Sequence, residues 1–209
     1  MAYSKKELNE RLREAAQAGD IENVKRLLGL GAEADAKDKD GWTAMMDAAG
    51  SGYLDVVKLL VESGAKINAR DKYGWTAMIN AAYWGRLDVV KFLVEKKAEV
   101  DARDNEGWTA LMRAASNGHF DVAKFLVDNG ADPGAKNNEG KTAATIARER
   151  GHKEVADFLD LLAWVKEKTD SIGRIDGRSL ELKPELSGLL RTREEQGYII
   201  AKYGVSYVV

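Results

Sequence analysis

The chain lacks several residue patterns on which function is often built. It has no cysteine among 209 residues, which excludes disulfides, thiolate metal ligands and thiol nucleophiles. It has no apolar run of about 18 residues and no apolar signal-peptide core after Met1, so we expect neither a membrane helix nor a secretory leader. The formal net charge is −2 and no basic run occurs, which predicts no attraction to nucleic acid or an anionic membrane. We therefore expect a cytoplasmic protein.

What the sequence does contain is a segment that recurs every 33 residues. Trp42, Trp75 and Trp108 each stand within Gly-Trp-Thr-Ala, and a weaker fourth copy has Lys141 in place of the tryptophan. A fixed period of this length predicts a solenoid of stacked units rather than one globular core. Function is then expected from the surface of the stack rather than from a catalytic pocket.

Each repeat predicts two helices and a hairpin-like loop. A threonine suited to capping a helix precedes a short Ala-rich run, which stops at a glycine where a left-handed cap is needed. A second helix follows, as over 54–61, with an acidic residue in its first turn, where the helix dipole favours negative charge. The threonines are Thr43, Thr76, Thr109 and Thr142, and the glycines are Gly52, Gly85, Gly118 and Gly151.

This pattern resembles the ankyrin repeat over roughly residues 5–162. The resemblance implies an all-α ankyrin-repeat solenoid, in which helix–turn–helix pairs are joined by hairpin loops. We expect an N-terminal capping repeat (1–37), three full repeats (38–136), a C-terminal repeat with an extended helix (137–168), and a linker and tail (169–209). The Gly-Trp-Thr-Ala-Leu-Met variant resembles bacterial ankyrin proteins, with an engineered relative as the alternative.

Two departures from the family pattern have physical consequences. The usual Thr-Pro-Leu-His segment is replaced by Thr-Ala-Met-Met and similar sequences, so the helices must rely on methionine packing instead of a Thr–His hydrogen-bond network. Lys97 stands where other repeats have glycine. If the backbone there keeps a positive φ, a strain of roughly 1–2 kcal/mol is expected.

The resemblance implies that a partner meets the concave side, formed by the loop tips and the exposed face of each first helix. By repeat position, the candidate partner-binding residues are Trp42, Asp47, Tyr53, Tyr73, Trp75, Asn80, Tyr83, Trp84, Trp108 and Arg113. The tip tryptophans recur identically, so packing between repeats and partner contact both remain open for them. Tyr83 and Trp84 occur in one repeat only, and exposed aromatics of this kind resemble binding hot spots. A core role stays open for them if the tail covers them.

Metal or nucleotide chemistry is not expected. His119 and His152 occupy the same place in successive repeats, and helices packed about 8–10 Å apart hold them too far apart to share a metal directly. The segment 134–142 imitates a phosphate-binding loop, but it has five residues between its glycines where that motif has four. We expect no cofactor and no metal.

The C-terminal tail is the least repeat-like part of the chain. We expect 160–168 to extend the last helix, 171–178 to form a linker, 179–182 a short strand, 184–196 a helix, and 197–209 strand-like structure. An end this apolar should be docked rather than free. The docking residues would be Tyr198, Ile199, Ile200, Tyr203, Val205 and Tyr207. The tail could be an enlarged cap, an occupant of the groove in its own or a neighbouring copy, or an element for a separate partner.

These observations favour a non-enzymatic module that binds a protein or peptide, with Asp47 and Arg113 giving the groove its polarity. The alternative is a self-assembling protein whose tail docks in the groove. A third reading, less favoured, is a small ligand-binding or enzymatic unit formed by the tail. Its polar residues would be Arg174, Asp176, Arg178, Glu181, Arg191, Arg193 and Glu194, a set that more often forms a solvated face.

Overall fold

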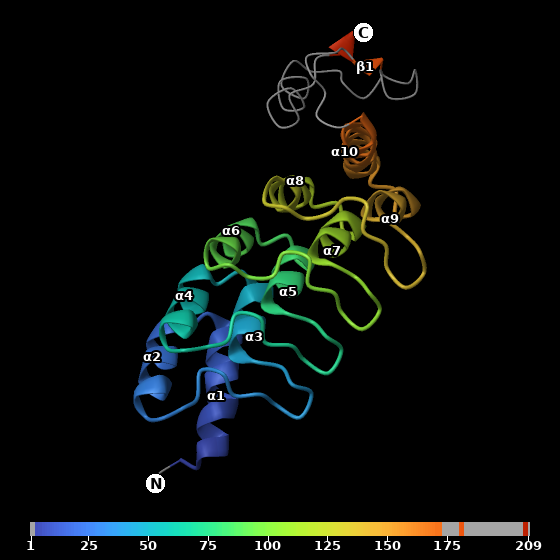
Figure 1. The fold of residues 1–209 in the computed structure, drawn as a ribbon. Coiled ribbons are helices and arrows are strands. Elements are labelled where there is room, and N and C mark those ends of the chain that lie inside the picture. The colour runs from blue at the N-terminus through green and yellow to red at the C-terminus, as the bar shows by residue number, and fades with distance from the viewer. Residues whose placement is uncertain (1–2, 173–179, 182–206, 209) are drawn as a thin grey trace.

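The chain folds into stacked helix pairs, as seen in a computed structural model that describes residues 3–172, 180–181 and 207–208. Figure 1 shows the helices of this part in two rows, with successive helices alternating between them. The first row contains α1 (Lys5–Ala18), α3 (Ala44–Ser51), α5 (Ala77–Tyr83), α7 (Ala110–Ser116) and α9 (Ala143–Glu149). The second contains α2 (Ile21–Gly29), α4 (Leu54–Glu62), α6 (Leu87–Glu95), α8 (Phe120–Asp128) and α10 (Lys153–Ile172). The predicted all-α solenoid is confirmed.

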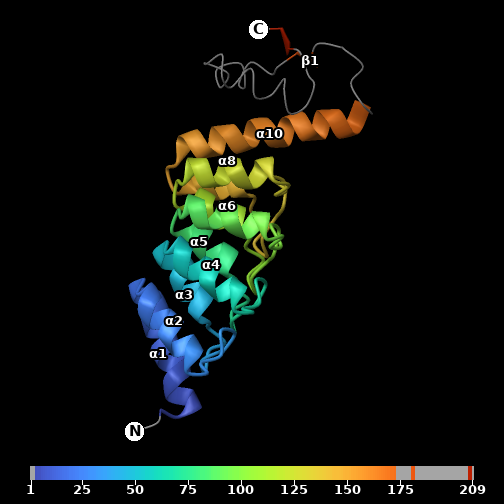
Figure 2. The ribbon, with the colours of Figure 1, turned by 90° about the vertical axis from the view of Figure 1, so that its left-hand side faces the viewer.

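The loops that join successive pairs all project on the same side, beside the first row and away from the second (Figure 1). In the perpendicular view, α10 lies across the C-terminal end of the stack and extends past α8 (Figure 2). The first row and the loops together form one continuous surface. We call it the inner face.

The ends of the first helices follow the predicted chemistry. Thr76 Oγ1 accepts a hydrogen bond from the Ile79 backbone N–H at 3.2 Å, and the equivalent threonines cap α3, α7 and α9 in the same way. Gly52, which ends α3, has φ of 89°, a left-handed conformation that glycine adopts without a steric penalty. Local sequence therefore determines where each short helix begins and ends.

Alanine and methionine fill the space between neighbouring first helices. The paired alanines of α3, α5 and α7 are completely buried, and their small side chains let the helices approach closely. The methionines of the replaced segment are buried as well: Met45, Met46, Met78 and Met112 are each at most 2% exposed. Met46 and Met112 stand at the position of the usual histidine. The expected dependence on methionine packing is confirmed.

Each loop is shaped by one carboxylate or amide. Asp104 Oδ1 accepts hydrogen bonds from the backbone N–H groups of Glu106 and Trp108, at 2.9 and 2.8 Å. Asp38, Asp71 and Asn137 do the same in the other three loops. Neighbouring loops are joined by backbone hydrogen bonds, such as Lys72 N–H to the Asp40 carbonyl at 2.7 Å. The loops are therefore held in register with one another.

A second set of contacts joins successive repeats through side-chain acceptors. Asp35, Asn68 and Asp101 each accept a hydrogen bond from a backbone N–H of the next repeat, at 3.2, 3.0 and 3.2 Å. The equivalent position in the third full repeat, 33 residues after Asp101, is Gly134, which has no side chain to accept such a bond from the C-terminal repeat.

Lys97 adopts the left-handed conformation that its position in the repeat predicts. Its φ is 62°, and among the described residues it is the one non-glycine residue with a positive φ. The equivalent positions in other repeats are Gly64 and Gly130, with φ of 92° and 99°. The positive φ on which the expected strain depends is therefore present.

The tail agrees with the sequence in part. The last helix extends beyond Lys168 as far as Ile172, so it includes the first two residues of the expected linker. The expected strand at 179–182 is present as β1 (Leu180–Glu181), which pairs in parallel with β2 (Tyr207–Val208). The expected helix at 184–196 lies outside the described residues.

We predict that Lys97→Gly stabilises the fold. Removing the side chain relieves the steric cost of a positive φ, offset in part by the greater freedom of glycine in the unfolded chain, so a gain of about 0.5–1 kcal/mol is expected. Urea denaturation measures it. The reciprocal variant Gly64→Lys should lose about 1–2 kcal/mol, because no atom lies within 4 Å of the added Cβ and only the backbone conformation is affected. Equal stability of all three proteins would contradict this explanation.

Candidate functional site

A row of stacked aromatic and arginine side chains crosses the inner face. The Arg113 guanidinium lies between two indole rings, 4.7 Å from the Trp75 centroid and 4.2 Å from that of Trp108. The Trp75 ring also contacts Tyr83 at 5.6 Å between centroids, and Tyr83 contacts Trp84 edge-on at 5.1 Å. We call Trp108, Arg113, Trp75, Tyr83 and Trp84 the aromatic–arginine row. Such contacts stabilise their partners by about 0.5–2 kcal/mol each.

Arg113 is built into this row rather than free on the surface. Its side chain is only 14% exposed, and its Nη2 lies 2.5 Å from Asp104 Oδ2 and 3.8 Å from a Glu106 carboxylate oxygen. Asp104 is the residue that shapes the third loop, so the ion pair connects α7 to that loop. The Arg113 Nε–H is buried and has no hydrogen-bond partner among the described residues. Packing between two indoles holds the guanidinium where it is.

Trp84 is the open end of the row. It follows α5 as its C-terminal cap residue, and it is 54% exposed, whereas Tyr83 is half-buried. Its edge-on contact with half-buried Tyr83 supports Trp84 without covering it. Among the candidate residues, this is the arrangement closest to a preformed contact.

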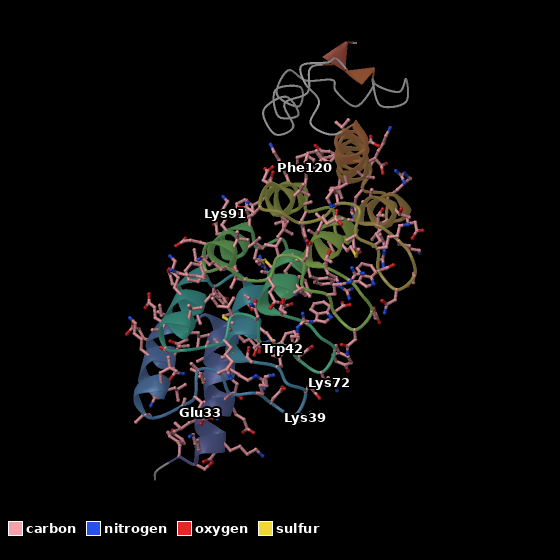
Figure 3. All side chains as sticks on the ribbon, in the orientation of Figure 1. Glu33, Lys39, Trp42, Lys72, Lys91 and Phe120 are labelled. Atoms are coloured by element: carbon pink, nitrogen blue, oxygen red, sulfur yellow. The ribbon has the colours of Figure 1, made fainter. Side chains whose placement is uncertain are left out.

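The three tip tryptophans pack against the core while remaining partly exposed. Figure 3 shows Lys39 and Lys72 toward the ends of their loops, with Trp42 nearer the helices. Trp75 and Trp108 enclose Arg113, whereas Trp42 makes a different contact: its Nε1–H donates to Asp47 Oδ1 at 2.8 Å. All three therefore help to hold the inner face together.

Asp47 is the centre of a polar cluster at the N-terminal part of the inner face. Its second oxygen accepts a hydrogen bond from Arg13 Nε at 3.2 Å, and Arg13 Nη1 also pairs with Asp38 at 2.8 Å. Burial raises the pKa of the Asp47 carboxyl above its usual range, and the bonds from Trp42 and Arg13 offset this only in part. Keeping this carboxylate charged in the folded protein therefore costs desolvation free energy.

Two candidate residues present no exposed side chain on the inner face: Asn80 is buried, and Tyr53, although 41% exposed, lies elsewhere. Asn80 is only 5% exposed, and its amide donates to the Met46 carbonyl at 2.7 Å, so it joins α5 to α3 inside the stack. Tyr53 lies at the turn between α3 and α4, at the opposite end of the helices from the loops, and its ring covers Gly19. Both make contacts between repeats.

Tyr73 is the most exposed of the candidates, at 59%, and it lies in the second loop with Lys72 Nζ 4.8 Å from its ring. It makes no ring contact with the aromatic–arginine row. The predicted docking residues Tyr198, Ile199, Ile200, Tyr203 and Val205 lie outside the described residues. Tyr207 is in β2, where it pairs with Leu180.

The histidines take structural positions. His119 and His152 cover Gly85 and Gly118, as Tyr53 covers Gly19, and His119 Nε2 is 3.0 Å from the Tyr83 carbonyl oxygen. Within the described part of the chain, no three histidine, aspartate or glutamate side chains gather as metal ligands would. Of the polar residues named for a site in the tail, all but Glu181, in β1, lie outside this part.

Sequence reasoning missed Arg13. Its guanidinium, in the N-terminal capping repeat, pairs with both Asp38 and Asp47 of the next repeat. The sequence offers no clear signal for this, because Lys37 and Lys39 flank Asp38 and are nearer cations along the chain. Only the packing of α1 against α3 shows that Arg13 reaches both.

Comparison with known families agrees with this architecture. A family model described as "Ankyrin repeats (3 copies)" matches residues 12–104 and again 99–163, which together cover more than half of the chain. The chain therefore belongs to the ankyrin repeat family, whose members are generally protein–protein interaction modules and typically not catalytic. A search of curated proteins finds no match. In the part of the chain described by the structure, no helix is long and apolar enough to cross a membrane.

We predict that the stability difference between the wild type and Asp47→Asn depends on pH. Because burial raises the folded pKa of Asp47 above its unfolded value of about 3.9, the folded state binds the proton more tightly. The stability that this proton contributes is fully present below the unfolded pKa and is lost as pH rises through the folded pKa. The wild type should therefore lose stability relative to Asp47→Asn as pH rises from about 4.

Urea denaturation of both proteins over a pH series tests this expectation. Asp55→Asn, at an exposed position in the first turn of α4, is the reference for a surface carboxyl. If the wild type instead becomes more stable relative to Asp47→Asn as pH rises, the contacts from Trp42 and Arg13 have a larger effect on the Asp47 pKa than burial has.

We predict that Arg113→Met destabilises the fold by about 1–3 kcal/mol, because it leaves the buried Asp104 carboxylate without its cation. Adding Asp104→Asn should recover part of the loss, since Asn137 already shapes an equivalent loop with its amide oxygen. Chemical denaturation of the single and double variants measures both effects. A single variant as stable as the wild type would mean that Arg113 is not needed to hold the row.

Proposed function

We propose that the chain is a non-enzymatic module that binds a partner protein or peptide on its inner face, with Trp84 as the main anchor. The exposure of Trp84 at the end of an otherwise packed row is the observation that carries this proposal. Binding hot spots are enriched in tryptophan, tyrosine and arginine, and they are effective where the surface is already ordered.

The construction of the inner face supports this function. Backbone bonds join the loops, Arg113 is clamped between two indoles, and Tyr83 supports Trp84 from one side. A partner would therefore meet a surface that needs little ordering, which limits the entropy lost on binding. Tyr73 adds a second exposed ring on the loop side. Asn80 and Tyr53 would act indirectly, by keeping the repeats in register.

The test is selection of binders from a library of random linear peptides displayed on phage, with the full-length chain as bait. We predict that Trp84→Ala weakens the selected binders at least about tenfold, as loss of a hot-spot tryptophan does. The matched control is Leu30→Ala, which removes a similarly exposed apolar side chain after α2. Titration by calorimetry compares the variants.

Binders that are indifferent to Trp84→Ala would overturn the proposal. The alternative of self-assembly, in which the tail of the same or a neighbouring copy occupies the inner face, has its own signature. Docking on a neighbouring copy would show as a mass that rises with protein concentration in light scattering and falls in Trp84→Ala, whereas docking on the same copy would leave the mass unchanged.

A further inference from the structure

The aromatic–arginine row has one unfilled position, on Trp84. Inside the row, Trp75 has Arg113 on one side and Tyr83 on the other, and Tyr83 has a ring on each side. Trp84 contacts Tyr83 alone among the rings and cations of the row, and more than half of its surface is open. An added planar or cationic group would continue the stack.

Toward the N-terminal end, the residues next to Trp84 are small, and we call them the low strip. One repeat earlier, the positions of Tyr83 and Trp84 are taken by Gly50 and Ser51. A side chain at position 50 has no room, because an added Cβ would lie 2.5 Å from the Asn80 amide nitrogen. Adjacent helices lie about 8–10 Å apart, so the low strip is about one side chain wide. Asn80 therefore keeps a bulky side chain off position 50, where Arg86 Nε donates to the Gly50 carbonyl at 3.0 Å.

Beyond this strip lies a depression with a surplus of negative charge. Glu10, Arg13, Glu14, Gln17 and Asp47 line it. Arg13 is already paired with Asp38 and Asp47, and Glu10 is only loosely paired with Lys6, at 3.8 Å. Glu14 is exposed and forms no ion pair with the described residues. By helix spacing, this acidic depression lies about 10–20 Å from Trp84.

We propose that the partner is a basic segment of a protein, in which an arginine lies on the open face of Trp84 and further positive charge faces the acidic depression. The inference rests on the proposed function and names the chemistry of the partner. Over the estimated span, an extended segment places its second basic residue about three to six residues from the arginine.

Arginine fits this place better than an apolar anchor does. The molecule already stacks its own Arg113 guanidinium on two indoles, so a partner arginine on Trp84 repeats a contact that this surface makes. A guanidinium is planar and weakly hydrated, so it stacks on an indole more readily than the lysine ammonium does. The carboxylates of the depression attract a cation and give an apolar side chain no advantage.

The peptides selected on the full-length chain provide the first test. Those that depend on Trp84 should be enriched in arginine, with a second basic residue at the stated spacing. Replacing the arginine by citrulline, a neutral side chain of nearly the same shape, should weaken binding about tenfold, and lysine should give an intermediate loss. Calorimetric titration of the synthetic peptides measures each change.

A matched pair of charge variants tests the acidic depression. Glu14→Gln should weaken the arginine peptides about two- to fivefold at low salt, and the difference should shrink at high salt. Glu62→Gln removes an equally exposed carboxylate from the end of α4, on the other row, and should have no effect. Equal effects of the two variants would mean that peptide affinity depends on the net charge of the protein and not on the carboxylates of the acidic depression.

The outcomes separate this inference from the proposed function. Peptides that depend on Trp84 but show no enrichment of basic residues, or that tolerate citrulline, would overturn the arginine assignment and leave the binding function standing. Selections that yield no peptide dependent on Trp84 would overturn both.

Discussion

The close contact between neighbouring first helices is the constraint on which the rest of the structure depends. A single helix pair cannot bury its own apolar face, so each repeat is stable only when the next one covers it. Completely buried alanines make that approach possible, and Met46, Ile79 and Met112 fill what remains. The loops can be joined by backbone bonds only because the helices beneath them are so evenly spaced. The order of the inner face is thus a result of core packing.

Repeated and unrepeated residues have different roles in this structure. Residues that recur, such as the capping threonines and the loop aspartates, account for the fold. Residues that break the repeat, above all Tyr83, Trp84 and Arg113, distinguish one part of the surface from another. The two sets of residues nevertheless contact each other, because the unrepeated Arg113 packs between Trp75 and Trp108, which belong to the repeated set.

The sequence predicted the helices, their caps and the left-handed Lys97, because each depends on neighbours within one repeat. It also identified Tyr83 and Trp84 as exceptional. It could not predict that Asn80 is buried, because that depends on Met46 in the preceding repeat, which offers a carbonyl to its amide. Nor could it predict the Trp75–Arg113–Trp108 stack. Contacts between repeats need the lateral distance between helices, which periodicity alone does not provide.

The acceptor side chains Asp35, Asn68 and Asp101 are followed in the series by Gly134, and this gives the array a direction of growth. A duplicated repeat inserted within the stack inherits an acceptor from the repeat before it and offers one to the repeat after it. The C-terminal repeat, which follows Gly134, has no such acceptor in the repeat before it. Gene duplication therefore continues this series of bonds when the new repeat is inserted before Gly134, and does not when it is inserted after Gly134.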